Sequence, residues 1–214
     1  MLQNIVQKLF GTLCIQVGDK MVDLHGEWPS VSFRELILKY ANIDIYEEDT
    51  KEKLLSKIHE MKIEIDSEIP LQNLGYGNLI DQLYKKVARP HLVNPVFLVD
   101  HPISLSPLAR ANDENPNLTD RFQLVINGAE IINAYSELVD PQEQERRLEE
   151  QARLKANGDE EAMPMDYDYI GAMEYGMPPI SGWGMGIDRL IQLLTASENI
   201  KDVVLFPLMR PRDN

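Results

Sequence analysis

The stretch from Asp120 to Glu137 reads D-R-F-Q-L-V-I-N-G-A-E-I-I-N-A-Y-S-E. Two runs of alternating residues flank Asn127-Gly128, which is the strongest short sequence signal for a two-residue hairpin turn. The pattern therefore predicts two antiparallel strands joined at this turn. If Ile126 and Ala129 close the turn, Val125 lies opposite Glu130.

Polar side chains are placed regularly along this predicted hairpin. Gln123 shares the face of Glu130 at diagonal reach, because side chains two residues apart point the same way. Three further polar residues recur at a spacing of two, namely Asn133, Tyr135 and Glu137. Strict alternation puts these three on the opposite face, so a single pocket requires a β-bulge, which we place near Ala134. The alternative is an ordinary hairpin whose polar face meets solvent.

A second informative stretch, residues 182–195, reads G-W-G-M-G-I-D-R-L-I-Q-L-L-T. Its glycines alternate and then give way to apolar residues at helical spacing, which predicts a strand that passes into a helix. The glycines free one face of side chains, so that a flat ligand can lie against the backbone. Arg189, in the first helical turn, then offers a planar two-pronged donor to an anion. Taken alone, the glycines equally fit close packing of a strand on a helix.

Several segments together resemble the class II lysyl-tRNA synthetases. The G-x-G-x-G-x-D-R block with L-L-T is similar to motif 3 of class II enzymes, and L-F-P-L-M-R-P at residues 205–211 is similar to the lysyl branch. The resemblance extends to S-P-L-A-R at residues 106–110, to E-I-I-N-A-Y-S-E-L at 130–138 and to D-Y-I-G-A-M-E-Y-G-M-P-P at 168–179. It covers essentially all of residues 1–214, whereas motifs 1 and 2 and the anticodon-binding barrel of the family are absent. It implies an α+β fold with an antiparallel sheet flanked by helices, as the C-terminal part of a catalytic domain.

The resemblance also implies an activity and a set of site residues. A lysine–tRNA ligase joins the carboxylate of lysine to the α-phosphate of ATP and passes the lysyl group to tRNA(Lys), with Mg²⁺ shared among phosphates and carboxylates. The catalytic residues implied are Glu130 and Arg189. The ATP-binding residues implied are Glu130, Ile131, Gly186 and Arg189. The lysine-binding residues implied are Asn133, Tyr135, Glu137, Gly182 and Gly184. Magnesium is assigned to Glu130, with Gln123 as a second ligand.

Two departures from the family pattern qualify this expectation. Gln123 stands where the family usually carries a carboxylate, so this position brings no charge to the metal. Without motif 2 the chain lacks the family's α-phosphate arginine, so we expect it to be inactive alone. We expect tRNA contacts and homodimerisation to depend mainly on the absent regions. The alternatives are a non-catalytic synthetase-like binding or regulatory module, and an aspartate or asparagine ligase, which Glu137 and the L-L-T and M-R-P signatures disfavour.

Composition narrows the remaining choices. A chain of 214 residues that is 43% hydrophobic has enough apolar residues for one core, so we expect a single domain over residues 1–214. A net charge of −14 argues against bulk electrostatic binding of nucleic acid. The single cysteine, Cys14, excludes an internal disulfide, and the scattered histidines show no metal-ligand spacing. No long apolar segment occurs, so we expect a cytoplasmic protein without membrane contact.

The rest of the chain shows further local signals. A capping box at Ser32 and Glu35 predicts a helix ending near Tyr40, and Asp140-Pro141 predicts the start of a helix over 142–156 with charges facing outward. We expect a loop over residues 101–119. The other expected helices cover residues 2–10, 51–61, 79–88 and 167–175, and the other expected strands cover residues 14–17, 21–24 and 96–99.

Overall fold

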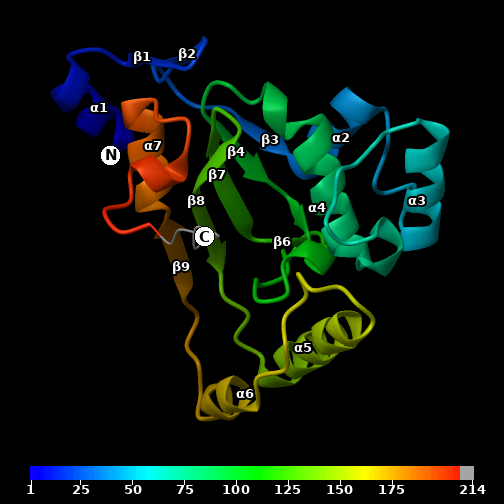
Figure 1. Ribbon diagram of the computed structural model, residues 1–214. Coiled ribbons are helices and arrows are strands. Elements are labelled where there is room, and N and C mark those ends of the chain that lie inside the picture. Colours follow the sequence, from blue (N-terminus) through cyan, green and yellow to red (C-terminus); the bar gives the residue numbers. More distant parts are fainter. Residues whose placement is uncertain (208–214) are drawn as a thin grey trace, which may run out of the picture.

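A computed structural model describes residues 1–207 of the chain (Figure 1). The helices are α1 (Leu2–Phe10), α2 (Phe33–Ala41), α3 (Lys51–Glu60), α4 (Tyr76–Val87), α5 (Pro141–Ala156), α6 (Tyr167–Glu174) and α7 (Ile187–Thr195). The strands are β1 (Cys14–Val17), β2 (Lys20–Asp23), β3 (Ser30–Ser32), β4 (Val96–Val99), β5 (His101–Pro102), β6 (Leu118–Thr119), β7 (Arg121–Ile126), β8 (Ala129–Ser136) and β9 (Ser181–Met185). Short 3₁₀ helices are η1 (Leu71–Asn73), η2 (Arg89–His91), η3 (Ile103–Leu105) and η4 (Ile200–Asp202). The M-R-P signature at residues 209–211 lies outside the described residues.

A five-stranded sheet in the order β3-β4-β7-β8-β9 forms the centre of the fold. The pairings β4–β7, β7–β8 and β8–β9 are antiparallel, whereas β3 runs parallel to β4. Helices pack around this sheet and connect its strands (Figure 1). The predicted α+β class with a mainly antiparallel sheet flanked by helices is therefore confirmed.

The central hairpin forms at the predicted turn. Asn127 and Gly128 both have positive φ angles, 49° and 70°, as a type I′ turn requires. Val125 pairs with Glu130 and Ile126 pairs with Ala129, as the sequence predicted. The amide N–H of Gly128 donates to the Leu92 carbonyl at 2.8 Å, so the turn is fixed to the segment before β4.

The predicted bulge exists, but at a different residue. Leu124 pairs with Ile132 while Val125 pairs with Glu130, so Ile131 is the extra residue of β8. The sequence favours a bulge near Ala134, because a small residue tolerates irregular backbone. The structure instead accommodates the extra residue by burying the Ile131 side chain, which is 1% exposed.

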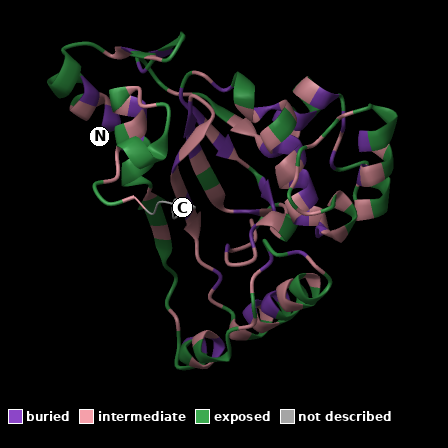
Figure 2. Ribbon diagram, viewed as in Figure 1, coloured by how far each residue is buried: buried purple, intermediate pink, exposed green. Residues whose placement is uncertain are grey.

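The two faces of the sheet pack against different parts of the chain. Val96, Leu98 and Val125 point toward α2, α3 and α4 and share a buried cluster with them. Leu124, Ile126 and Ile131 point the other way, into a cluster with α1, the β1–β2 hairpin and α7. Figure 2 shows this central region as largely buried, whereas β9 is mostly exposed. The helices of the first cluster cover β3 and β4, which leaves the same face of β7 and β8 for a site.

Local signals set the helix boundaries, with one difference. The Ser32 hydroxyl accepts from the Glu35 amide and the Glu35 carboxylate accepts from the Ser32 amide, which completes the predicted capping box of α2. In contrast, α4 begins at Tyr76, three residues before the predicted start, because its N-cap is Gly75 and offers no side-chain signal. Gly77 in its first turn is required sterically, since a Cβ there would lie 2.2 Å from the Ser104 carbonyl oxygen.

Helices α5 and α6 lie together at one end of the molecule, joined to β8 and β9 by extended segments (Figure 1). Asp140 caps α5 as predicted. The charged side chains of α5 are less exposed to solvent than the sequence predicted, because Arg147 is 7% exposed and donates to the Ala109 carbonyl at 2.8 Å.

The expected loop over residues 101–119 includes the two short strands β5 and β6. Within residues 1–207, the helices are all too short or too polar to cross a lipid bilayer.

Candidate active site

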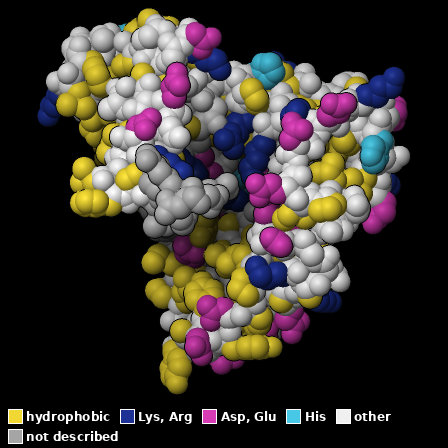
Figure 3. Space-filling view, viewed as in Figure 1, with side chains coloured by type: hydrophobic (Ala, Val, Ile, Leu, Met, Phe, Trp, Pro, Cys, Tyr) yellow, Lys and Arg dark blue, Asp and Glu magenta, His cyan; other side chains and the backbone are white. Residues whose placement is uncertain are grey.

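A cleft of about 620 Å³ opens over β7 and β8, between α4 and the start of α7. Four cations line it, namely Lys85, Arg89, Arg121 and Arg189. Three acidic residues, Asp81, Glu130 and Glu198, share the same walls. Figure 3 shows Lys and Arg side chains gathered in the hollow between the α7 side and the α4 side of the molecule. A pocket with several convergent cations and a few carboxylates suits a polyanion that carries a metal ion.

The bulge at Ile131 brings the two predicted sets of polar residues onto one face. Gln123 of β7 pairs with Asn133 of β8. The Gln123 side chain also forms a hydrogen bond with Glu130, which lies on the same face of β8. Farther along the same face, Arg121 pairs with Tyr135. The alternative of a hairpin whose polar residues simply face solvent is wrong for this stretch, because these side chains contact one another at half-buried positions.

Arg189 and Glu130 meet where α7 begins. The Arg189 Nη1 donates to the backbone carbonyl of Glu130 at 3.1 Å and lies 3.8 Å from its carboxylate. Half of the Arg189 side chain remains exposed. Among residues 1–207, one backbone hydrogen bond holds the guanidinium at the cleft wall, and its other N–H groups make no hydrogen bond there and can reach a ligand.

Gln123 links Glu130 to a buried histidine. Because an ionised carboxylate only accepts hydrogen bonds, the group that Gln123 presents to Glu130 is its NH₂. The Gln123 carbonyl oxygen then faces the His101 Nε2 at 3.1 Å, which requires the proton of the neutral ring on Nε2. Burial, with a smaller contribution from Arg121, lowers the pKa of His101 to about 3. His101 therefore stays neutral near pH 7 and fixes the orientation of the Gln123 amide.

This orientation corrects the expected metal-ligand role of Gln123. An amide coordinates magnesium through its oxygen, and that oxygen is turned toward His101 rather than the cleft. Glu130 is the one predicted metal ligand that faces the cleft with a carboxylate. A single carboxylate fits Mg²⁺ when the phosphates of a nucleotide supply further oxygen ligands.

Arg121 is a cleft residue that the sequence motifs did not single out. Its Nε donates to Asn133 Oδ1 at 3.0 Å, and its Nη1 donates to the Leu105 carbonyl at 3.1 Å and the Ser106 hydroxyl at 3.0 Å. Burial lowers the pKa of Arg121, while the carboxylate of Glu130 acts in the opposite direction. Its place at spacing two from Gln123 could have indicated it. Ser106, at the start of the S-P-L-A-R segment, thus helps to hold Arg121 in place.

The far end of the same face holds Glu137. Tyr135 pairs with Gly182 and Asn133 pairs with Gly184 across β8 and β9. A Cβ on Gly182 would lie 3.0 Å from the Glu137 carboxylate, whereas a Cβ on Gly184 would meet only open space. Burial raises the pKa of Glu137, and within residues 1–207 no hydrogen bond or cation compensates. A half-buried carboxylate without a partner is a ready acceptor for an ammonium group.

Two predicted ATP-binding residues lie at the junction of β8 and α7. The side chain of Ile131 is buried behind the sheet and does not line the cleft, so the predicted contact of Ile131 with ATP would have to use its backbone. Its carbonyl accepts the Gly186 N–H at 3.0 Å. Both residues therefore serve to hold the start of α7, and with it Arg189, against β8.

Comparison with known proteins agrees with this geometry. Residues 1–210 match the family model described as tRNA synthetases class II (D, K and N). The chain belongs to this family. This member of the class II tRNA synthetase family is similar to three proteins named lysine–tRNA ligase. The protein from Thermosipho africanus is 46% identical, and the match covers 97% of this chain and 40% of the relative. The protein from Carboxydothermus hydrogenoformans is 40% identical, and the match covers 100% of this chain and 43% of the relative. The protein from Porphyromonas gingivalis is 41% identical, and the match covers 99% of this chain and 36% of the relative.

The class II synthetase chain spans about two-fifths of the length of these relatives. The resemblance to the lysyl branch noted in the sequence is confirmed by their names.

The sequence motifs did not single out three basic residues of the cleft, namely Lys85, Arg89 and Arg121. They come from α4, η2 and β7, and the fold alone brings them together with Arg189.

Proposed function

We propose that the chain carries the lysine- and ATP-binding part of a lysine–tRNA ligase. The isolated carboxylate of Glu137 supports this most directly, because it stands beside Gly182 without a cation among residues 1–207. An ε-ammonium group would supply the missing charge. Tyr135 and Asn133 lie along the strand between Glu137 and Glu130, so the backbone of lysine would lie toward the cationic cleft.

The cationic cleft would bind the nucleotide. Arg189 would hold an outer phosphate through the guanidinium N–H groups that do not contact Glu130. Glu130 would hold Mg²⁺ together with the phosphates, and the ion would offset negative charge there. Gly184 leaves room over the sheet for a flat group such as the adenine or the aminoacyl moiety.

We further propose that adenylate formation and transfer to tRNA(Lys) need parts of the longer relatives outside the matched two-fifths. Within residues 1–207, the outer edge of β9 has no partner strand, so the lysine side of the site is open there. An open site leaves water around the reacting groups and weakens electrostatic stabilisation of the transition state. Homodimer formation would likewise involve the longer protein, although the unpaired edge of β9 would itself favour pairing with another chain.

Titration calorimetry tests the proposed substrate class. Lysine should bind the chain in the presence of ATP and Mg²⁺, and norleucine, which lacks the ε-amino group, should bind at least about 30-fold more weakly. Aspartate should not bind, because its side chain would meet the Glu137 carboxylate. Equal affinity for lysine and norleucine would remove Glu137 from the site, and tighter binding of aspartate would favour the aspartate branch of the family.

A further inference from the structure

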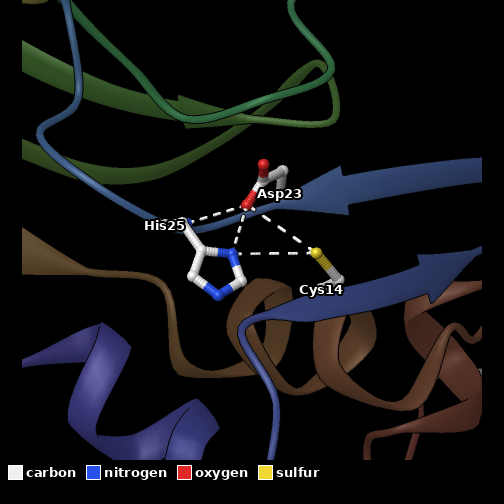
Figure 4. A group of neighbouring side chains, drawn as sticks. All are labelled: Cys14, Asp23 and His25. Atoms are coloured by element: carbon white, nitrogen blue, oxygen red, sulfur yellow. Dashed lines mark hydrogen bonds and ion pairs between the residues drawn. The ribbon is translucent and has the colours of Figure 1, made fainter.

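A second group of metal-binding side chains lies on the β1–β2 hairpin, away from the cleft. The Sγ of Cys14, the Oδ1 of Asp23 and the Nδ1 of His25 all lie within 4.8 Å of one another. Figure 4 shows the three side chains converging beside the hairpin. The linear sequence gave no metal-binding spacing, because the register Cys14↔Asp23 is what brings the thiol to the carboxylate.

The three donor atoms are spaced so that a single divalent ion could contact all of them. The three distances are 3.8 Å from Cys14 Sγ to Asp23 Oδ1, 3.7 Å from Cys14 Sγ to His25 Nδ1, and 2.7 Å from His25 Nδ1 to Asp23 Oδ1. A triangle with these sides has a point about 2 Å from all three atoms, close to the roughly 2.0–2.3 Å that zinc prefers for nitrogen, oxygen and sulfur ligands. No rearrangement of the backbone is required to bring the ligands together.

The same geometry argues against a nucleophilic Cys-His-Asp triad. In such a triad the acidic residue and the nucleophile contact opposite nitrogens of the imidazole ring. Here both the carboxylate and the thiol face Nδ1 of His25. Convergence of three donor atoms on one side of the ring is the arrangement of metal ligands.

Charge and access also suit a cation. A thiolate and a carboxylate together carry two negative charges, which a divalent ion balances, and the mixed sulfur, nitrogen and oxygen set favours zinc-like ions over magnesium. The side chains of Asp23 and His25 are 54% and 58% exposed, which gives an ion a direct path and leaves the fourth position to water.

We propose that Cys14, Asp23 and His25 form a zinc-type metal site that clamps the β1–β2 hairpin. Ile15 and Val22 of this hairpin pack in the same buried cluster as Leu190 and Leu193 of α7. A metal at the hairpin would therefore stabilise the surface on which α7 rests. This site is independent of the lysine and ATP sites, and its test does not involve them.

Titration of the untagged full chain with Zn²⁺, in a phosphine reductant and after chelator treatment, tests the proposal. We expect one saturable site per chain, with the dissociation constant raised at least about 100-fold by Cys14→Ser and by His25→Ala. His59→Ala is the matched control, because His59 is exposed on α3, and it should leave binding unchanged. Zinc at 100 times the dissociation constant should raise Tm by about 5–10 °C in the wild type and not in Cys14→Ser.

Co²⁺ gives an independent spectroscopic readout. Cobalt bound by a thiolate shows a sulfur-to-metal charge-transfer band, which should appear in the wild type and in His59→Ala and disappear in Cys14→Ser. Circular dichroism would show whether each variant remains folded. Absence of a stoichiometric site, or equal binding by wild type, Cys14→Ser and His25→Ala, would overturn the proposal.

Discussion

The Gln123 side-chain amide donates a hydrogen bond to the Glu130 carboxylate across the β7–β8 pair. This contact puts an uncharged donor where a second carboxylate would otherwise bind magnesium. His101 fixes this orientation of the Gln123 amide, because its Nε2 forms a hydrogen bond with the Gln123 oxygen and holds that oxygen away from the cleft. The proposed metal ion therefore depends on Glu130 and on the ligands that the nucleotide brings.

Gln123→Glu should increase the magnesium dependence of ATP binding. The added carboxylate would repel Glu130 in the empty site and attract Mg²⁺ when ATP is bound, because cation affinity rises with ligand charge. We expect the affinity for ATP to rise about tenfold at saturating Mg²⁺ and not in its absence. Calorimetry at both magnesium concentrations measures this difference. An identical response in wild type and variant would place the ion away from Gln123 and Glu130.

Arg189→Ala should weaken ATP binding without destabilising the fold. The side chain is half exposed and contacts the protein through Glu130, so its removal costs little packing. Loss of a charge-assisted phosphate contact of about 1.5–3 kcal/mol corresponds to roughly 10–100-fold weaker binding. Arg153→Ala is the control, since Arg153 is a 67% exposed surface arginine on α5. An unchanged ATP dissociation constant in Arg189→Ala would mean that the arginine has a structural role alone.

Ser32→Ala should separate stability from ligand binding. The hydroxyl of Ser32 caps α2 at a distance from the cleft, and its loss leaves one amide of the first turn without a partner. We expect the free energy of unfolding to fall by about 1 kcal/mol, measured by urea denaturation. Lysine and ATP affinities should stay at the wild-type values. A wild-type unfolding midpoint in Ser32→Ala would show that this cap does not stabilise the chain.

Burial of His101 predicts a specific pH dependence of stability. The folded protein takes up no proton on His101 until about pH 3, whereas the unfolded chain does so at about 6.5. The contribution of His101 is therefore complete above pH 6.5 and declines as the pH falls, by up to about 1.4 kcal/mol per pH unit. His101→Gln retains a donor toward Gln123 but does not titrate. Urea unfolding between pH 7 and 4 should show a steeper loss for wild type than for this variant, and parallel profiles would contradict the assignment.

The sequence predicted the parts of this fold that depend on neighbouring residues. The Asn127-Gly128 turn, the Ser32 capping box and the strand-to-helix passage before Arg189 each have a local cause, and the structure confirms them. The need for a bulge was also visible, because Glu130 and Asn133 otherwise fall on opposite faces. Its place at Ile131 was not, since it depends on how the isoleucine packs behind the sheet.

Features that depend on tertiary contacts were missed for the same physical reason. The orientation of the Gln123 amide is set by His101, which is 22 residues away in the sequence. The position of Arg121 in the cleft is fixed by Leu105 and Ser106. The proximity of Cys14 to His25 follows from a strand register rather than from a spacing motif. In each case the partner lies in a different segment, so no single stretch of sequence carries the signal.

Lysine binding to Glu137→Gln tests the central claim most directly. Titration calorimetry in the presence of ATP and Mg²⁺ should show lysine affinity reduced at least about 30-fold, because the ε-ammonium group would lose its charged acceptor, while ATP affinity is preserved. Glu149→Gln, which changes an exposed carboxylate on α5, should bind lysine as the wild type does. Wild-type lysine affinity in Glu137→Gln would contradict the account and place the amino-acid site elsewhere.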